Sequence, residues 1–89
     1  MTDSRKYRPR DGVAYRKIAG EMVLVDPREN ILLRLNATAT AIWESLEEGD
    51  VDRLTDRVVT EFQVERDTAY QDVAEFIASV LSRNLIVPR

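Results

Sequence analysis

The sequence predicts an α+β fold that is winged helix-turn-helix-like, in which a three-stranded antiparallel sheet is followed by three helices (βββααα). Between residues 13 and 35, short apolar segments alternate with turn residues, as in a meander of strands. At Asn36 the apolar spacing changes from every second residue to every third or fourth, as on a helix. Strands that precede helices, rather than alternate with them, are typical of α+β domains.

The three predicted strands cover residues 13–18, 21–25 and 31–35. Ala19 and Gly20 are expected to form the first turn. The second turn contains Pro27 and ends at Asn30, which tolerates the left-handed conformation. Because both connections are short, neighbouring strands are expected to pair antiparallel.

The first predicted helix covers residues 37–48. It begins after Asn36, whose side chain can accept a hydrogen bond from a free amide of the first turn. Gly49 is expected to end it in the left-handed conformation. One face carries the apolar side chains that the other segments must cover, namely Ala39, Ile42, Trp43 and Leu46.

The second and third predicted helices are also amphipathic. Asp50 is the expected cap of the second helix, which ends near residue 62. The third helix is expected to start at Glu65 or Asp67 and to end near residue 83. Asn84 then stops it in the left-handed conformation.

The length of 89 residues predicts one domain, over residues 12–87, after a flexible tail of residues 1–11. Residues 85–87 are expected to fold back as a short extended segment. The sequence contains neither an apolar run of about 18 residues nor a secretory signal. A cytoplasmic protein without a membrane partner is therefore expected.

The composition argues against catalysis. The chain has no cysteine and no histidine, which removes thiolate nucleophiles, the commonest general base and the usual zinc ligands. Asp72 and Glu75 are spaced as on a solvated helix face, and no phosphate-binding glycine motif is present. We therefore predict a protein that is not an enzyme and needs no cofactor or metal.

The charge is uneven along the chain. Residues 1–34 carry eight Lys/Arg and five Asp/Glu, a net charge of +3, whereas residues 35–89 carry five and eleven, a net charge of −6. In a winged helix the third helix usually enters the DNA major groove, but here that helix is acidic and phosphate would repel it. No nucleic-acid partner is expected, although the basic N-terminal part leaves a winged-helix transcriptional regulator as an alternative.

Two apolar features predict a peptide-binding site. The third helix has a second apolar stripe beside its first, made of Tyr70, Ala74, Ile77 and Leu81. The third strand closes the meander as a sheet edge, and its apolar residues lack the proline, bulge or repeated charge that protects edges. An extended peptide could add to this edge while its side chains enter a groove along the stripe. Two alternatives stay open: both stripes belong to the core, or the tail or a second copy of the chain covers the edge.

The residues also resemble a known family. The pattern Leu33-x-Leu35-Asn36-x-x-Ala39-x-x-Ile42-Trp43-x-x-Leu46-x-x-Gly49 is similar to that of the PqqD family. Three further segments fit it, namely Val23-Leu24-Val25-Asp26, Asp72-Val73-x-x-Phe76-Ile77 and Leu85-Ile86. The resemblance covers roughly residues 12–87. Position 33, often aromatic in the family, is leucine here, and position 84, often glycine, is asparagine.

The resemblance implies a small module that binds the leader segment of a ribosomally made precursor peptide. The leader adds as a strand to the third strand, lies against the third helix, and is presented to a peptide-modifying enzyme such as a radical SAM enzyme, a cyclase or a leader peptidase. The implied peptide contacts are Ile31, Leu32, Leu33, Arg34, Tyr70, Val73, Ala74, Ile77 and Leu81. The family alone does not assign a quinone-cofactor, lasso or other pathway.

We therefore predict a non-catalytic leader-peptide-binding module that is a monomer or a weak homodimer. The main alternative is a winged-helix transcriptional regulator or a protein–protein adaptor. A third hypothesis is a structural subunit whose apolar edge only forms a homodimer.

Overall fold

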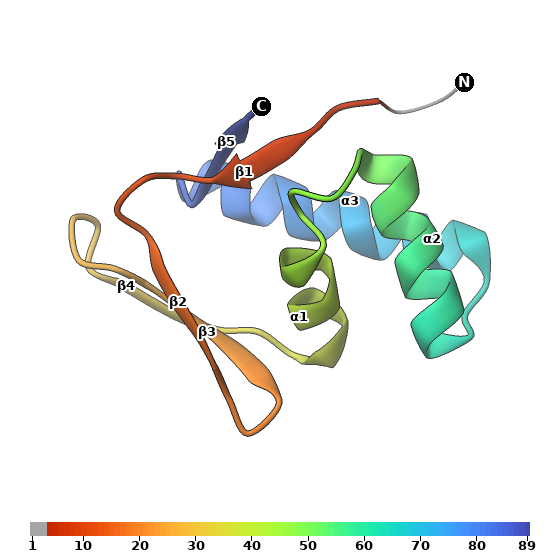
Figure 1. Ribbon diagram of the computed structural model, residues 1–89, viewed down its shortest axis with the longest axis horizontal. Helices are drawn as coiled ribbons and strands as arrows, with labels where there is room; N and C mark the ends of the chain where they lie inside the picture. The colour runs from red at the N-terminus through yellow and green to blue at the C-terminus, as the bar shows by residue number, and fades with distance from the viewer. Residues whose placement is uncertain (1–3) are drawn as a thin grey trace.

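The computed structural model describes residues 4–89, with helices and a small sheet arranged as in Figure 1. The strands and helices are β1 (Tyr7–Pro9), β2 (Ala14–Ile18), β3 (Glu21–Asp26), β4 (Ile31–Arg34), α1 (Ala37–Glu44), α2 (Val51–Phe62), α3 (Arg66–Ser82) and β5 (Ile86–Pro88). The predicted α+β class, with a three-stranded antiparallel sheet and three helices, is confirmed. The short strands β1 and β5 add to the predicted order and pair with each other.

The sheet has the strand order β2–β3–β4, and both pairs are antiparallel. Ala19 and Gly20 form the two-residue turn between β2 and β3, with φ angles of 51° and 84°. Positive φ at both positions matches the right-handed twist of the two flanking strands. Asn30 also has a positive φ, of 54°, directly before β4. The predicted turns at these positions are confirmed.

The two faces of the sheet have different surroundings. Along β3, Met22, Leu24 and Asp26 are buried and alternate with half-buried residues. Leu33 lies opposite Leu24, and Ile31 opposite Asp26, so these β4 side chains share the buried face. Figure 1 shows the three helices gathered on one side of the sheet. We call this side the inner face and the opposite side the outer face.

Thr40, in the first turns of α1, joins the helix to the end of the sheet. Its Oγ1 accepts a hydrogen bond from the Met22 N–H (3.0 Å) and donates one to the Leu35 carbonyl (3.3 Å). The side chain is buried, so water cannot replace these bonds. Thr40 therefore fixes the angle at which the chain leaves β4 and enters α1.

Replacing Thr40 with valine keeps the shape but removes the hydroxyl, and leaves the Met22 amide without its partner. We expect the free energy of unfolding to fall by about 1–3 kcal/mol, the usual cost of a buried unsatisfied group. Urea unfolding, followed by the fluorescence of Trp43, measures the change. Thr40→Ser is the matched control, because it keeps the hydroxyl. A Thr40→Val variant that is no less stable than Thr40→Ser would contradict this role.

The observed C-terminal end of α1 differs from the predicted one. Asn36 caps it as expected, accepting from the Ala39 N–H at 2.8 Å, but the helix ends at Glu44 rather than at residue 48. Gly49 has no positive φ, so its predicted role as a left-handed stop is wrong. A Cβ at position 49 would lie 2.6 Å from the Cγ of Arg53, so glycine is needed there for close approach of that side chain.

The other helix ends follow the prediction more closely. Asp50 caps α2, accepting from the Arg53 N–H at 3.0 Å, and the helix ends at Phe62. Gln63 follows in the left-handed conformation, which the sequence did not reveal. α3 starts after Glu65, and Asn84 has the expected positive φ, of 58°.

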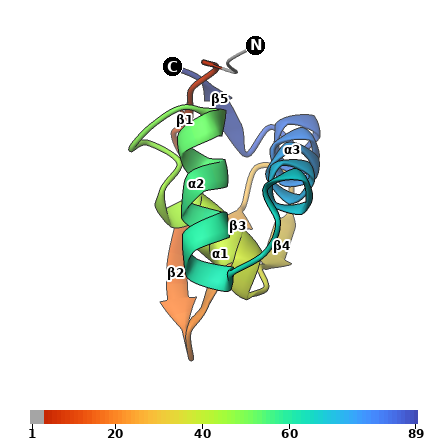
Figure 2. The same cartoon turned by 90° about the vertical axis from the view of Figure 1, so that its right-hand side faces the viewer.

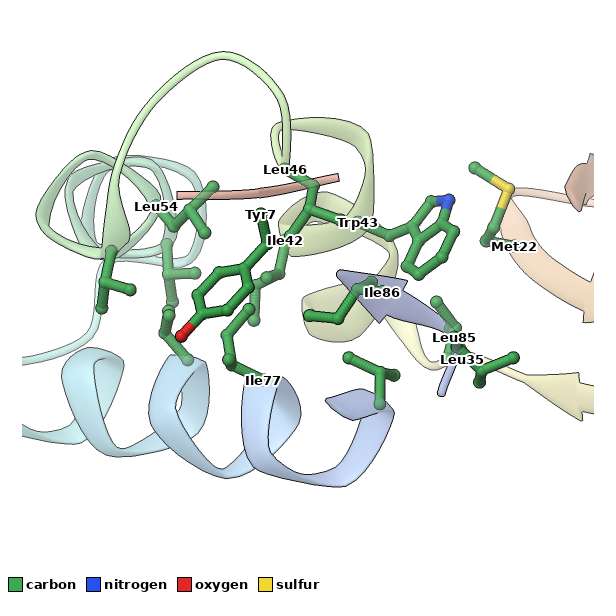
Figure 3. Packing of buried hydrophobic residues seen from close by; sticks show 14 of the residues in the cluster. Tyr7, Met22, Leu35, Ile42, Trp43, Leu46, Leu54, Ile77, Leu85 and Ile86 are labelled. Carbon is green, nitrogen blue, oxygen red and sulfur yellow. The ribbon is translucent and has the colours of Figure 1, made fainter. Parts of the chain in front are cut away.

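The N-terminal segment is part of the fold. The flexible tail was predicted for residues 1–11, of which residues 1–3 lie outside the described part of the chain. The prediction is wrong for Tyr7–Pro9, which pairs antiparallel with β5. Tyr7 is only 5% exposed, and Figure 3 shows its ring among Ile42, Leu54 and Ile77. The free energy gained by burying this one aromatic side chain offsets the entropic cost of ordering an otherwise polar segment.

A buried ion pair fixes the same segment to the sheet. Asp26 at the end of β3 is 0% exposed, and its carboxylate pairs with the guanidinium of Arg10. Arg10 also donates from Nε to the Asn84 carbonyl (2.5 Å) and from its backbone N–H to the Leu85 carbonyl (3.0 Å). The other oxygen of Asp26 accepts from the Arg28 amide at 3.2 Å. Arg10 thus joins the N-terminal segment, the β3–β4 turn and the end of α3.

Candidate functional site

Within the described residues, β4 pairs with β3 on one side only, so its other edge is open. The Leu35 N–H donates to the Met22 carbonyl at 2.8 Å, which means that the backbone of Leu35 points toward β3. Backbone groups alternate sides along a strand, so Ile31 and Leu33 also point toward β3. The N–H and C=O groups of Leu32 and Arg34 therefore point outward, toward the open edge.

The side chains of β4 divide between the two faces of the sheet. Ile31 and Leu33 are half-buried on the inner face, next to the hydrophobic core. Leu32 is 74% exposed on the outer face. Arg34 shares that face and donates from Nε to a carboxylate oxygen of Glu21 at 2.7 Å. The open edge thus has an apolar inner side and a largely uncovered outer side.

α3 has a buried stripe with a flank on either side of it. The stripe consists of Ala69, Val73, Ile77 and Val80, all of which are buried. At about 100° per residue, Tyr70, Ala74 and Leu81 lie to one side of this stripe. Asp72, Phe76 and Ser79 lie to the other side. We call these two sides the Tyr70 flank and the Phe76 flank.

The Tyr70 flank faces the N-terminal segment. Ala74, Ile77 and Leu81 line a pocket of about 110 Å³ together with Arg5, Tyr7 and Val51. Three of the predicted contact residues, Ala74, Ile77 and Leu81, therefore lie beside the N-terminal segment. Val73, also predicted, is fully buried. Tyr7 of β1 packs into the core beside Ala74, Ile77 and Leu81, whereas Tyr70 on the same flank is 40% exposed.

The Phe76 flank faces the start of α1 instead. A hollow of about 360 Å³ lies there and begins at Asn36, two residues beyond β4. Its lining residues are Asn36, Thr38, Ala39, Ile42, Asp72, Glu75, Phe76 and Ser79. In Figure 2, α3 and β4 lie on the same side of the molecule. The sequence pattern did not reveal this hollow, because it assigned Phe76 to the core stripe and Asp72 and Glu75 to a solvated face.

The hollow has an apolar floor and an acidic rim. Ile42 is buried and Phe76 is half-buried, whereas Asp72 and Glu75 carry carboxylates.

Among residues 4–89, no three His, Cys, Asp or Glu side chains are grouped so that they could hold a metal ion. At the start of α3, a hydrogen bond to Asp56 raises the pKa of the Arg66 guanidinium and joins α3 to α2. In the same described part, no helix is long and apolar enough to span a bilayer.

Residues 21–86 match the family model described as coenzyme PQQ synthesis protein D (PqqD). The chain belongs to the PqqD family. The match includes β3, β4 and all three helices of this PqqD-family chain, so it contains both the open edge and the Phe76 flank. The family resemblance seen in the sequence is thereby confirmed. A search of curated proteins finds no significant match.

Two solved structures are similar to this PqqD-family chain over most of its length. TbiB1 in complex with the TbiA(beta) leader peptide is 26% identical, with a TM-score of 0.82 over 89% of this chain and 93% of that one. A lasso peptide synthetase B1 complexed with its leader peptide is also 26% identical, with a TM-score of 0.83 over 93% and 99% of the two chains. Both of these similar proteins hold a leader peptide.

Proposed function

We propose that this PqqD-family chain is a non-catalytic module that binds the leader segment of a ribosomally made precursor peptide and presents it to a peptide-modifying enzyme. The open edge of β4 carries the proposal, because Leu32 and Arg34 offer outward backbone groups beside the half-buried side chains of Ile31 and Leu33. The leader peptides held by two similar solved structures support it.

The leader is proposed to add to β4 as a fourth strand. Its backbone then pairs with the outward groups of Leu32 and Arg34, which sets the register. Every second peptide side chain points to the inner face, where Ile31, Leu33 and the floor near Phe76 provide apolar contacts. Of the peptide contacts predicted from the sequence, we retain the four in β4, which are Ile31, Leu32, Leu33 and Arg34. On α3 we place the contacts on the Phe76 flank rather than on the Tyr70 flank.

We further propose to describe the fold as winged-helix-like, with α2 and α3 as the helix pair and the β2–β3 hairpin as the wing. This description does not favour DNA binding. α3 begins beside Glu65 and Asp67, and the hollow on its Phe76 flank is rimmed by Asp72 and Glu75. A phosphate backbone would be repelled by these carboxylates.

The test is a titration of the ¹⁵N-labelled chain with the leader segment of the small peptide encoded next to its gene. Saturable amide shifts are expected at residues 31–36 and on the Phe76 flank of α3, with smaller shifts at Tyr70, Ala74 and Leu81. A dissociation constant of about micromolar to nanomolar is expected, because ordering the flexible peptide on binding costs conformational entropy. A scrambled leader and a DNA duplex are the controls. Shifts confined to the Tyr70 flank, or saturable shifts with DNA alone, would contradict the proposal.

A further inference from the structure

The position of β4, which carries the open edge, is fixed at the two ends of the strand. Within the described part of the chain, β3 is the only helix or strand whose backbone lies close to that of β4. At the C-terminal end, Thr40 donates to the Leu35 carbonyl. At the N-terminal end, the turn residues 27–30 are exposed, so packing does not hold the turn. The position of β4 at this end therefore depends on Asp26, which is buried and lies opposite Ile31.

Arg10 joins this end of the sheet to the end of α3. Its guanidinium pairs with the carboxylate of Asp26, and only 19% of the arginine side chain is exposed. Its Nε donates to the Asn84 carbonyl (2.5 Å) and its backbone N–H to the Leu85 carbonyl (3.0 Å), just after α3. We call these three interactions the Arg10 bridge. The bridge spans the sheet and α3, which are the two walls of the proposed peptide site.

The buried carboxylate makes the Arg10 bridge a requirement of the folded chain. Asp26 is 0% exposed, and a buried charge is stable only when it is paired. Its other oxygen accepts from the Arg28 amide at 3.2 Å and so holds the β3–β4 turn. Because β4 starts at Ile31, opposite Asp26, the bridge fixes the start of β4 relative to the end of α3.

The bridge depends in turn on the N-terminal segment. Arg10 directly follows β1, which is held by the buried ring of Tyr7 and by the Arg89 N–H, a donor to the Lys6 carbonyl at 2.9 Å. In Figure 1 the chain between β1 and β2 passes beside the β3–β4 turn. Arg10 and β1 precede residues 21–86, which the family model matches, so the family assignment gives them no role.

We propose that Arg10 is a positioning residue of the leader-binding site, and that docking of the N-terminal segment through the Arg10 bridge sets the separation between β4 and α3. This inference rests on the proposed leader-binding function. The docked segment and the bound leader favour the same arrangement of the two walls, so each stabilises the other by the same factor. A leader that contacts β4 and the Phe76 flank therefore also stabilises β1 and β5, which it does not touch.

The experiment compares five full-length chains: the wild type, Arg10→Met, Arg10→Lys, the double variant Arg10→Met with Asp26→Asn, and Arg8→Met. The double variant removes the buried charge together with the bridge. Lysine keeps a positive charge for Asp26, but its single ammonium group lacks the fork of donors that also reaches the Asn84 carbonyl. Arg8→Met is the matched control, because Arg8 pairs with Asp11, whose side chain is almost fully exposed.

The affinity of each chain for the leader segment is measured by calorimetry, at a temperature where circular dichroism shows that the chain is folded. Arg10→Met and the double variant are expected to lose about tenfold in leader affinity, a usual size for coupling between sites. Arg10→Lys should be intermediate, and Arg8→Met should stay within about twofold of the wild type. A purely structural role of Arg10 would instead restore leader affinity in the double variant along with its stability.

Hydrogen exchange gives the reciprocal measurement in the wild type. The Arg10 and Arg89 amides are bonded between the N-terminal segment and the end of the chain, and both are freed when that segment undocks. Saturating leader is expected to slow exchange at these two amides by about tenfold. The Gln63 amide, at the exposed end of α2, is the control, and its exchange should not change.

A double variant that binds the leader as tightly as the wild type would overturn this role of Arg10 and leave the proposed function standing. Exchange at Arg10 and Arg89 that is unchanged by saturating leader would overturn the coupling in the same way. If Arg10→Met is not folded, Arg10→Lys and the double variant still decide the comparison. A wild type that binds no leader would overturn the proposed function and this inference together.

Discussion

Replacing Leu32 with proline is expected to lower the affinity of the chain for the leader peptide by about tenfold to a hundredfold. The backbone of Leu32 faces the open edge, so proline removes an outward donor and places its ring where the added strand would pair. β4 offers outward groups only at Leu32 and Arg34, and losing the pairing at one of them costs about 1–3 kcal/mol. Calorimetric titration with the leader segment measures this loss.

The fold itself should tolerate the change. The Leu32 amide makes no bond to β3, and Ile31 before it is already in the extended conformation that precedes proline. Lys17→Pro is the matched control, because alternation along β2 turns the backbone of Lys17 outward at the opposite edge of the sheet. Equal leader affinities for the two proline variants would show that the peptide does not add to β4.

Replacing Arg10 with methionine is expected to lower the free energy of unfolding by about 3–5 kcal/mol, the usual cost of leaving a buried charge unpaired. Asp26 is fully buried and, within residues 4–89, keeps only the Arg28 amide as a partner after this change. Domains of this kind are stable by only about 5–15 kcal/mol in total. Urea unfolding, followed by the buried Trp43, measures the loss.

Arg8→Met is the control with the same change of side chain. Arg8 pairs at 3.4 Å with Asp11, whose side chain is almost fully exposed, and such pairs contribute about 0–1 kcal/mol. The double variant Arg10→Met with Asp26→Asn should recover part of the lost stability, because it removes the buried charge and keeps an acceptor for Arg28. Similar losses for Arg10→Met and Arg8→Met would contradict this role of the ion pair.

Most of the elements of the fold could be predicted because their signals are local. Alternating apolar residues placed the three sheet strands, and side chains such as Asn36 and Asp50 marked where helices begin. The edge position of β4 followed from the order of the meander. Gly49 was misread because a glycine that permits the close approach of Arg53 looks the same in sequence as one that ends a helix.

The N-terminal segment could not be predicted from local pattern. Tyr7 stands between two basic residues, and its strand is only three residues long. Its partner β5 is about eighty residues away along the chain, so neither strand is stable without the other and the core between them. The roles of Arg10 and Thr40 could not be predicted for the same reason. A buried polar side chain is identified by its hydrogen-bond partners, and these partners are not its neighbours in sequence.

The sequence alone determined the elements, the family resemblance and the edge strand Ile31–Arg34, because each depends on residues close together in the chain. Only the tertiary structure decided which side of α3 accompanies that edge. Periodicity showed that α3 is apolar on more than one face, but not which neighbour lies against each. The docking of β1 places Tyr7 beside Ala74, Ile77 and Leu81, whereas the hollow on the Phe76 flank begins at Asn36, two residues beyond β4. Such placement depends on contacts between distant segments, which no local pattern contains.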